Sequence, residues 1–150
     1  MCLLGVGNSD FGDDSLGNQF AAQLLKRFEH CSEQPDIIDV GMLPERFVSR
    51  IIDDIKYDTV VFLDAVDFSA EIGSVLVANA EEMGSRFPQI STHKISLGML
   101  ATWLESNGAT KAWLIGIQPG LMKMGQGITE TVQSTIDLLV DVIYDLWSEI

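Results

Sequence analysis

The stretch CLLGVGNSDFGDDSLG, residues 2–17, decides the fold of this chain of 150 residues. It begins as a short apolar run that ends at Gly7, which is typical of a buried β-strand followed by a turn. From Leu16 to Phe28 the apolar residues then recur every three or four positions, which predicts an amphipathic helix. A strand that passes into a helix in this way begins a β-α-β unit, so the stretch predicts a parallel sheet.

Three carboxylates stand between this strand and this helix, on Asp10, Asp13 and Asp14. The first turn of a helix carries partial positive charge and free N–H groups, so it commonly binds phosphate or another anion. Here the chain places anions of its own at that position. Asp13 or Asp14 would serve as a helix cap worth about 1 kcal/mol, and the alternative is that these carboxylates bind a cation.

The composition limits the class of protein and its partners. Hydrophobic residues make up 47% of the chain and only 4 prolines occur, which favours a close-packed single domain over residues 1–150. The formal net charge of −13 would repel a nucleic-acid backbone and an anionic membrane surface. We therefore expect no nucleic-acid or membrane partner, and attraction toward a basic partner or a cation.

Cysteine usage and the N-terminus indicate where the protein works. Cys2 and Cys31 show neither a CxxC pair nor the spacing of a disulfide framework, so we expect two reduced thiols. The N-terminus lacks the charged segment of a signal peptide, and no apolar run approaches the roughly 20 residues that span a bilayer. We expect a soluble, cytoplasmic protein.

The remaining pattern alternates strands and helices. The segment 73–80 follows the third strand too closely for a crossover helix, which predicts an antiparallel strand, and a loop through Pro88 comes next. The expected strands are 2–7, 36–40, 58–66, 73–80 and 111–117, and the expected helices are 16–28, 43–55, 91–108 and a long terminal helix from Ile128. This order predicts an α/β fold of three layers, α/β/α: a mixed, mostly parallel, five-stranded twisted sheet with one antiparallel strand, flanked by helices.

Polar residues are expected to converge where the strand order reverses. Ligands of open α/β sheets bind beyond the carboxyl ends of the strands at that point, which a flavodoxin-like order places between the first and third strands. Asp14 follows the first strand, Asp64 ends the third, and His93 opens the helix that leads to the last strand. Two carboxylates and an imidazole suit a divalent transition metal. Taken alone, His93 is an ordinary polar residue, whereas a carboxylate that ends a buried apolar strand, as on Asp64, is costly unless it is paired or coordinating.

A nucleotide site is the competing interpretation of the first turn. GVGNSDFG, residues 5–12, is rich in glycine, and Asp39 ends the second strand where a dinucleotide-binding domain places its ribose-binding acid. However, Asp10 occupies the position of the third glycine of GxGxxG, and the carboxylates would face the pyrophosphate with no nearby Arg or Lys. We expect no nucleotide.

With these residues in hand, the chain resembles the hydrogenase maturation endopeptidases over nearly its whole length. The motifs that carry the resemblance are GVGN at 5–8, GDD at 12–14, DVGMLPE at 39–45, VVFLDAVDF at 60–68, STHKISL at 91–97 and GIQP at 116–119. Among the branches of that family, the chain most resembles the protease that serves the formate-linked, membrane-associated hydrogenase. Two positions depart from the family pattern: Ser15 replaces a common Gly, and DVGM at 39–42 replaces a common Asp-Gly-Gly-Thr.

The resemblance implies an enzyme, a nickel-dependent endopeptidase that removes the C-terminal extension of a nickel-iron hydrogenase large-subunit precursor after nickel insertion. It implies that Asp14, Asp64 and His93 bind the metal and act in catalysis, and it selects Asp14 over Asp13. It also implies that the nickel arrives with the precursor, which is the partner of this protein. We expect this protein to act as a monomer. A non-catalytic metal-sensing or chaperone-like module that binds the nickel-loaded subunit would use the same residues and remains the alternative.

Five further residues are candidates for contacts with a protein substrate. Asp39 and Asp67 would lie on the same edge of the sheet and attract a basic residue, with surface solvation as the equal alternative for each. Gly41 belongs to the DVGM motif, which the resemblance associates with substrate recognition. Met122 and Met124 lie in the loop 118–127 and suit an adaptable apolar groove, unless that loop tucks them into the core.

Overall fold

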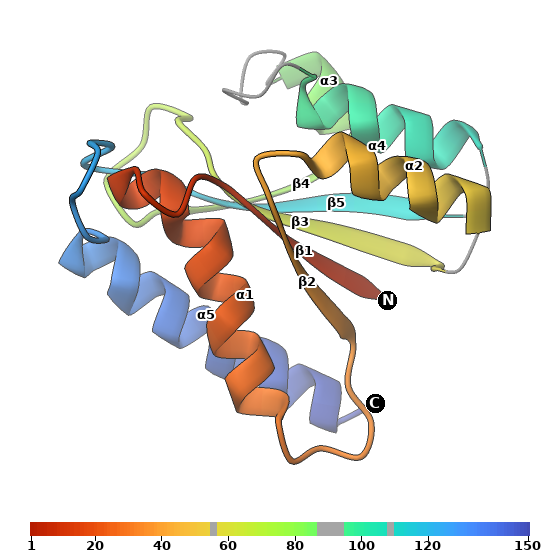
Figure 1. The fold of residues 1–150 in the computed structure, drawn as a ribbon, viewed down its shortest axis with the longest axis horizontal. Helices are drawn as coiled ribbons and strands as arrows, with labels where there is room; N and C mark the ends of the chain where they lie inside the picture. The colour runs from red at the N-terminus through yellow and green to blue at the C-terminus, as the bar shows by residue number, and fades with distance from the viewer. Residues whose placement is uncertain (55–56, 87–94, 108–109) are drawn as a thin grey trace.

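The sheet of this protein has five strands in the order β2-β1-β3-β5-β4 (Figure 1). The structure is a computed structural model that describes residues 1–54, 57–86, 95–107 and 110–150. All neighbouring strands are parallel except β4, which pairs antiparallel with β5. The strands are β1 Cys2–Val6, β2 Asp36–Gly41, β3 Thr59–Ala65, β4 Val75–Asn79 and β5 Lys111–Ile117. The predicted α/β fold and its one antiparallel strand are therefore confirmed, and β1 lies next to β3 as a flavodoxin-like order requires.

Helices cover both faces of this sheet, which makes three layers (Figure 1). Alternate strand residues point to opposite faces, so each strand contributes to two apolar cores. Leu3 and Leu63 pack with α1 (Leu16–Phe28) and α5 (Glu130–Ser148). Leu4 and Phe62 pack with α2 (Pro44–Asp54), α3 (Ala80–Arg86) and α4 (Leu97–Ser106). Burial on both faces explains why β1 and β3 read as almost continuous apolar runs.

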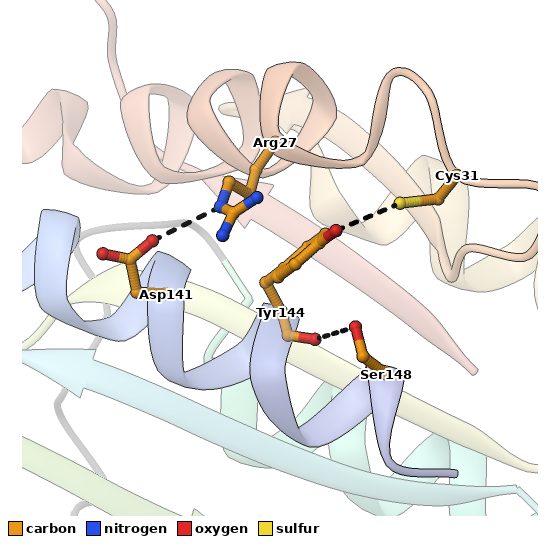
Figure 2. Close-up of polar contacts among 5 residues, drawn as sticks. All are labelled: Arg27, Cys31, Asp141, Tyr144 and Ser148. Carbon is orange, nitrogen blue, oxygen red and sulfur yellow. Dashed lines mark hydrogen bonds and ion pairs between the residues drawn. The ribbon is translucent and has the colours of Figure 1, made fainter.

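Polar and aromatic contacts fix α1 against the second half of α5 (Figure 2). The Arg27 guanidinium lies 3.6 Å from the centre of the Tyr144 ring, and its Nε lies 3.3 Å from Asp141 Oδ1. Cys31 Sγ lies 3.8 Å from the Tyr144 hydroxyl, and the Ser148 hydroxyl donates to the Tyr144 carbonyl. Neither Cys2 nor Cys31 forms a disulfide bond. No helix in the described part of the chain is long and apolar enough to cross a membrane.

One helix was predicted as loop. Residues Ala80–Arg86 form α3, whose start is a capping box. The Asn79 side chain accepts a hydrogen bond from the Glu82 N–H (2.9 Å), and the Glu82 carboxylate accepts one from the Asn79 N–H (3.0 Å). The signal was present as Asn79-Ala-Glu-Glu82, an N-cap residue followed three positions later by Glu, and the prediction overlooked it because the helix is so short.

The predicted helix 91–108 begins later than expected. Helix α4 starts at Leu97, and the Ser96 hydroxyl caps it by accepting a hydrogen bond from the Met99 N–H (3.2 Å). The prediction started the helix at residue 91, although Ser96 also precedes apolar residues at helical spacing and can cap a helix. His93 and Gly108, which the prediction placed at the two ends of this helix, lie outside the described residues.

The first turn of α1 lies directly on the ends of β1 and β3. A Cβ atom added to Gly17 would lie 2.1 Å from the Val6 carbonyl oxygen and 2.3 Å from that of Leu63. Only glycine allows this approach, because both neighbours are backbone atoms that no rotamer change can move. The segments that follow β1, β3 and β5 gather at this edge, on the left of Figure 1.

Candidate metal and substrate site

Asp14 and Asp64 are brought together at the point where the strand order reverses. Asp14 belongs to a 3₁₀ turn, Gly12–Ser15, between β1 and α1. Asp64 is the next-to-last residue of β3, which neighbours β1 in the sheet. Both residues are buried, with 9% of Asp14 and 2% of Asp64 exposed. The predicted meeting of these two carboxylates between the first and third strands is present in the structure.

The carboxyl group of Asp64 is the most strongly perturbed group at this edge. Burial raises the pKa of Asp64 well above its ordinary value, and the neighbouring carboxylate of Asp14 raises it further. The Ala65 N–H donates a hydrogen bond to Asp64 Oδ1 (2.8 Å) and offsets part of the rise. A carboxyl group whose ionisation is disfavoured by burial and by a neighbouring carboxylate is a common feature of functional sites, and a cation beside Asp64 would relieve the repulsion.

The third predicted metal ligand, His93, lies outside the described residues. Within residues 1–54, 57–86, 95–107 and 110–150, no group of three His, Cys, Asp or Glu side chains is placed to hold a metal ion. Asp14 and Asp64 supply oxygen donors, which fit a hard or borderline divalent cation. A complete ligand set therefore requires at least one donor from outside the described residues or from a bound partner.

Asp13, the neighbour of Asp14, has a different role from either role predicted for it. It does not cap α1, whose N-cap residue Ser15 makes no side-chain cap bond. Its side chain is completely buried and accepts four hydrogen bonds from Gly120, Leu121 and Thr129. Asp13 thus ties the turn after β1 to the loop after β5, a pairing across more than 100 residues that no local pattern predicts.

Asp39 and Gly41 line a groove beside this turn. The groove has a volume of about 490 Å³ and lies between residues 7–10, Asn18 and the end of β2. Asp39 Oδ1 accepts hydrogen bonds from the Asn18 side chain (2.7 Å) and from the Gly41 N–H (3.0 Å). Gly41 has a φ of 57°, a conformation that favours glycine. The exposed Asp39 carboxylate is therefore held at the groove by its neighbours, and its contact with a substrate stays a prediction.

Asp67 is exposed, and its carboxylate is part of the loop that follows β3. The Gln118 side chain donates to Asp67 Oδ1 (3.1 Å), as does the Ser69 N–H (3.1 Å). These hydrogen bonds, that of Gln118 first, lower the pKa of Asp67. Gln118 also accepts from the N–H groups of Phe68 and Ala70, so it organises the loop next to Asp64. Sequence reasoning missed Gln118, although a polar residue directly after a buried strand was a usable signal.

Two apolar side chains of the loop 118–127 are exposed to solvent. Met124 is 77% exposed and Leu121 is 42% exposed, whereas Met122 is partly buried. Asp13 holds one end of this loop through Gly120 and Leu121. The alternative that the loop tucks its methionines into the core is therefore wrong for Met124. Whether Met122 and Met124 contact a substrate stays a prediction.

Comparison with known proteins gives a consistent result over the chain. A family model, described as the hydrogenase maturation protease HycI, matches residues 20–146. A protein of Methanocaldococcus jannaschii that is named as a hydrogenase maturation protease is 24% identical over 155 aligned residues, which cover 100% of this chain and 89% of that protein.

Solved structures match with the same topology. The crystal structure of the nickel-iron hydrogenase maturation protease HycI from Thermococcus kodakarensis is 29% identical, with a TM-score of 0.77 over 96% of this chain and 89% of that chain. The endopeptidase HycI from Escherichia coli is 23% identical, with a TM-score of 0.76 over 93% of this chain and 86% of that chain. At that lower identity, the likeness supports the fold alone.

Proposed function

The chain belongs to the hydrogenase maturation protease family, a family of endopeptidases, and from that premise we propose that it removes the C-terminal extension of a nickel-iron hydrogenase large-subunit precursor after nickel has been inserted. The observation that carries the proposal is the buried pair Asp14 and Asp64 at the carboxyl ends of β1 and β3. An enzyme that hydrolyses a peptide bond needs groups that place and polarise the reacting atoms. This pair is the strongest candidate for that role in the described part of the chain.

The metal in this proposal is part of the substrate. Asp14 and Asp64 offer oxygen donors to nickel held in the precursor, and His93 adds an imidazole nitrogen. The approach of a divalent cation favours the ionised form of Asp64, which burial and Asp14 disfavour in the free protein. Binding is then strong only where nickel is present, which would make the metal a recognition mark.

Placement accounts for much of the proposed catalysis. Asp64 lies near the end of β3, Asp14 lies in the turn before α1, and the first turn of α1 packs against the ends of β1 and β3 through Gly17. A precursor held there through its nickel would present one peptide bond in a fixed position. Nickel supplies Lewis acidity at that bond, either by polarising its carbonyl or by lowering the pKa of a water molecule.

The test replaces the three proposed ligands one at a time. Asp14→Ala, Asp64→Asn and His93→Ala should each slow the cleavage of a nickel-loaded precursor by roughly a hundredfold or more. His30→Ala and Asp137→Ala are matched controls, because His30, which follows α1, and Asp137, on α5, are both exposed and lie away from the pair. These controls should cleave normally. Cleavage at the normal rate by Asp14→Ala or His93→Ala would refute the proposal.

A further inference from the structure

The carboxylate of Asp13 is surrounded by hydrogen-bond donors from one distant segment. Oδ2 accepts from the N–H groups of Gly120 (2.7 Å) and Leu121 (3.1 Å) and from the Thr129 hydroxyl (2.5 Å). Oδ1 accepts from the Thr129 N–H (2.6 Å). Asp13 is completely buried, so these contacts are shielded from water and each lost contact would leave a buried polar group unsatisfied. We call this set of four hydrogen bonds the Asp13 clasp.

The backbone around Asp13 joins the same segment. The Asp13 N–H donates to the Leu121 carbonyl (2.8 Å), and the Gly125 N–H donates to the Asp10 carbonyl (3.0 Å). Gly12 has a φ of 57°, and a Cβ atom there would lie 2.4 Å from the Leu121 carbonyl oxygen. The turn after β1 and the loop after β5 are therefore in direct backbone contact, and the clasp closes that contact.

Thr129 gives up a helix cap for this clasp. It is the N-cap residue of α5, yet its side chain makes no cap hydrogen bond. Its hydroxyl donates to Asp13 and accepts from the Leu121 N–H (3.4 Å). A threonine cap ordinarily stabilises a helix by about 1 kcal/mol. The Thr129 hydroxyl therefore makes the hydrogen bond to Asp13 in place of a cap hydrogen bond within α5.

Asp14 directly follows Asp13 in the chain, so the clasp lies next to the proposed metal ligand. Asp13 and Asp14 share one 3₁₀ turn, in which the Asp14 N–H donates to the Phe11 carbonyl (3.1 Å) and the Asp14 carbonyl accepts from the Asn8 N–H (3.1 Å). A shift of Asp13 would therefore move the backbone of Asp14. The loop that the clasp holds carries the exposed side chains of Leu121 and Met124.

We propose that Asp13 is a positioning residue that couples the loop 118–127 to Asp14. The surface that receives the substrate chain and the carboxylate that receives its metal then keep one fixed relative position. The inference rests on the proposed function. It assigns the two neighbouring aspartates opposite tasks: Asp13 holds the protein together at the site, and Asp14 faces the substrate. Leu121 and Met124 offer exposed apolar side chains to the substrate chain, with the exposed Lys123 between them.

The test uses Thr129, because its hydroxyl can be removed without changing the shape of the side chain. Thr129→Val leaves the N–H bond to Asp13 Oδ1 intact but removes the hydroxyl donor, and Thr129→Ser restores that donor. Asp13→Asn replaces one acceptor oxygen with an NH₂ group. Because both oxygens of Asp13 accept hydrogen bonds from N–H or O–H groups, this NH₂ group would face another donor and lose the hydrogen bond. Thr135→Val is the matched control: this residue lies on the same helix, and its hydroxyl donates to the Gly73 carbonyl instead (2.8 Å).

Two readouts separate positioning from stability. The first is hydrogen exchange at the amides of Gly120, Leu121 and Thr129. Exchange at these amides should be roughly tenfold faster in Thr129→Val and Asp13→Asn, because each variant loses one hydrogen bond of the clasp. The second is steady-state cleavage of the nickel-loaded precursor at a temperature where every variant is fully folded. There kcat/KM should fall by roughly tenfold or more, with KM raised as well as kcat lowered. Thr129→Ser and Thr135→Val should match the wild-type protein in both.

The outcomes are distinct. If Thr129→Val and Asp13→Asn keep wild-type kinetics while Asp14→Ala is inactive, the coupling is refuted and the proposed function stands. Unchanged exchange at Gly120 and Leu121 in both variants would also overturn the clasp as the element that holds the loop. If Asp14→Ala cleaves at the wild-type rate, the proposed function itself fails, and the coupling proposal fails with it.

Discussion

Asp14 and Asp64 come from different elements, yet they lie close enough that the carboxylate of Asp14 contributes to the raised pKa of Asp64. Burial of Asp64 is the larger cause. Because burial disfavours the ionised form of Asp64, its raised pKa costs stability at neutral pH, which is typical of groups retained for binding or catalysis.

The first prediction concerns the stability of Asp64→Asn in the metal-free protein. Folding raises the pKa of Asp64 above its ordinary value of 3.8. As the pH rises above 3.8, the unfolded state therefore loses the Asp64 proton while the folded state still holds it. The contribution of Asp64 to the free energy of unfolding therefore falls as the pH rises from 3.8 through the raised pKa. Asparagine does not titrate and can still accept the Ala65 N–H.

Urea unfolding at several pH values measures this effect. At pH 7 Asp64→Asn should be more stable than the wild-type protein, and the gap should shrink toward zero as the pH falls below 3.8. The same variant should be inactive in cleavage. Parallel stability profiles for the two proteins across this pH range would contradict the raised pKa.

The second prediction concerns the contact of α1 with the strand ends. Gly17→Ala would place a methyl group about 2 Å from two backbone oxygens, so α1 must move, which should cost roughly 1–3 kcal/mol of stability. Cleavage should also fall at temperatures where the variant is folded, because Asp14 lies in the turn that leads into this helix. Thermal unfolding and a cleavage assay measure both effects.

Gly84→Ala is the matched control for that substitution. A Cβ atom at Gly84 meets nothing within 4 Å, and Gly84 lies within α3. Alanine there should raise the stability by about 0.5–1 kcal/mol and leave cleavage unchanged. Equal effects of the two substitutions would mean that α1 does not depend on the close approach at Gly17.

The third prediction concerns the exposed carboxylates of Asp39 and Asp67. If they attract a basic segment of the precursor, the double variant Asp39→Asn, Asp67→Asn should raise KM by roughly threefold or more at low ionic strength, and the effect should shrink in high salt. Asp53→Asn, Asp54→Asn removes the same charge from the far end of α2 and should leave KM unchanged. Identical KM values for the two double variants would dispose of this role.

The fourth prediction concerns the exposed apolar loop. Met124→Ser removes a side chain that is 77% exposed, so stability should change by less than about 0.5 kcal/mol. KM for the precursor should rise several-fold if this side chain contacts the substrate. Met99→Ser removes a methionine that is 66% exposed on α4 and serves as the control. A KM unchanged by Met124→Ser would remove this residue from the substrate surface.

Local and periodic patterns predicted most of the fold. Helix α1 and strand β5 have the predicted bounds, because apolar spacing and flanking turn residues mark both ends of each. The β-α-β alternation predicted the parallel strands, and the short connection before β4 predicted its antiparallel direction. The misses were local: the capping box at Asn79 opens a helix too short to show periodicity, and the serine that caps α4 lies inside the stretch predicted as helix.

The candidate site was predictable only in part. Asp64 could be found because a carboxylate at the end of a buried strand needs a reason to be there. The separate tasks of Asp13 and Asp14 could not be read from periodicity, since Asp13 is fixed by Gly120 and Thr129, more than 100 residues away. Long-range hydrogen bonds of this kind leave no spacing pattern in a single sequence.

Intact mass spectrometry of a hydrogenase large-subunit precursor tests the central claim most directly. The nickel-loaded precursor and a nickel-free preparation of the same protein are each incubated with this enzyme. The proposed function predicts that a C-terminal peptide is lost from the loaded precursor alone, and that Asp14→Ala prevents this loss. Binding of the loaded precursor without cleavage would contradict it and favour the non-catalytic binding module. Equal cleavage of both preparations would contradict the dependence on nickel.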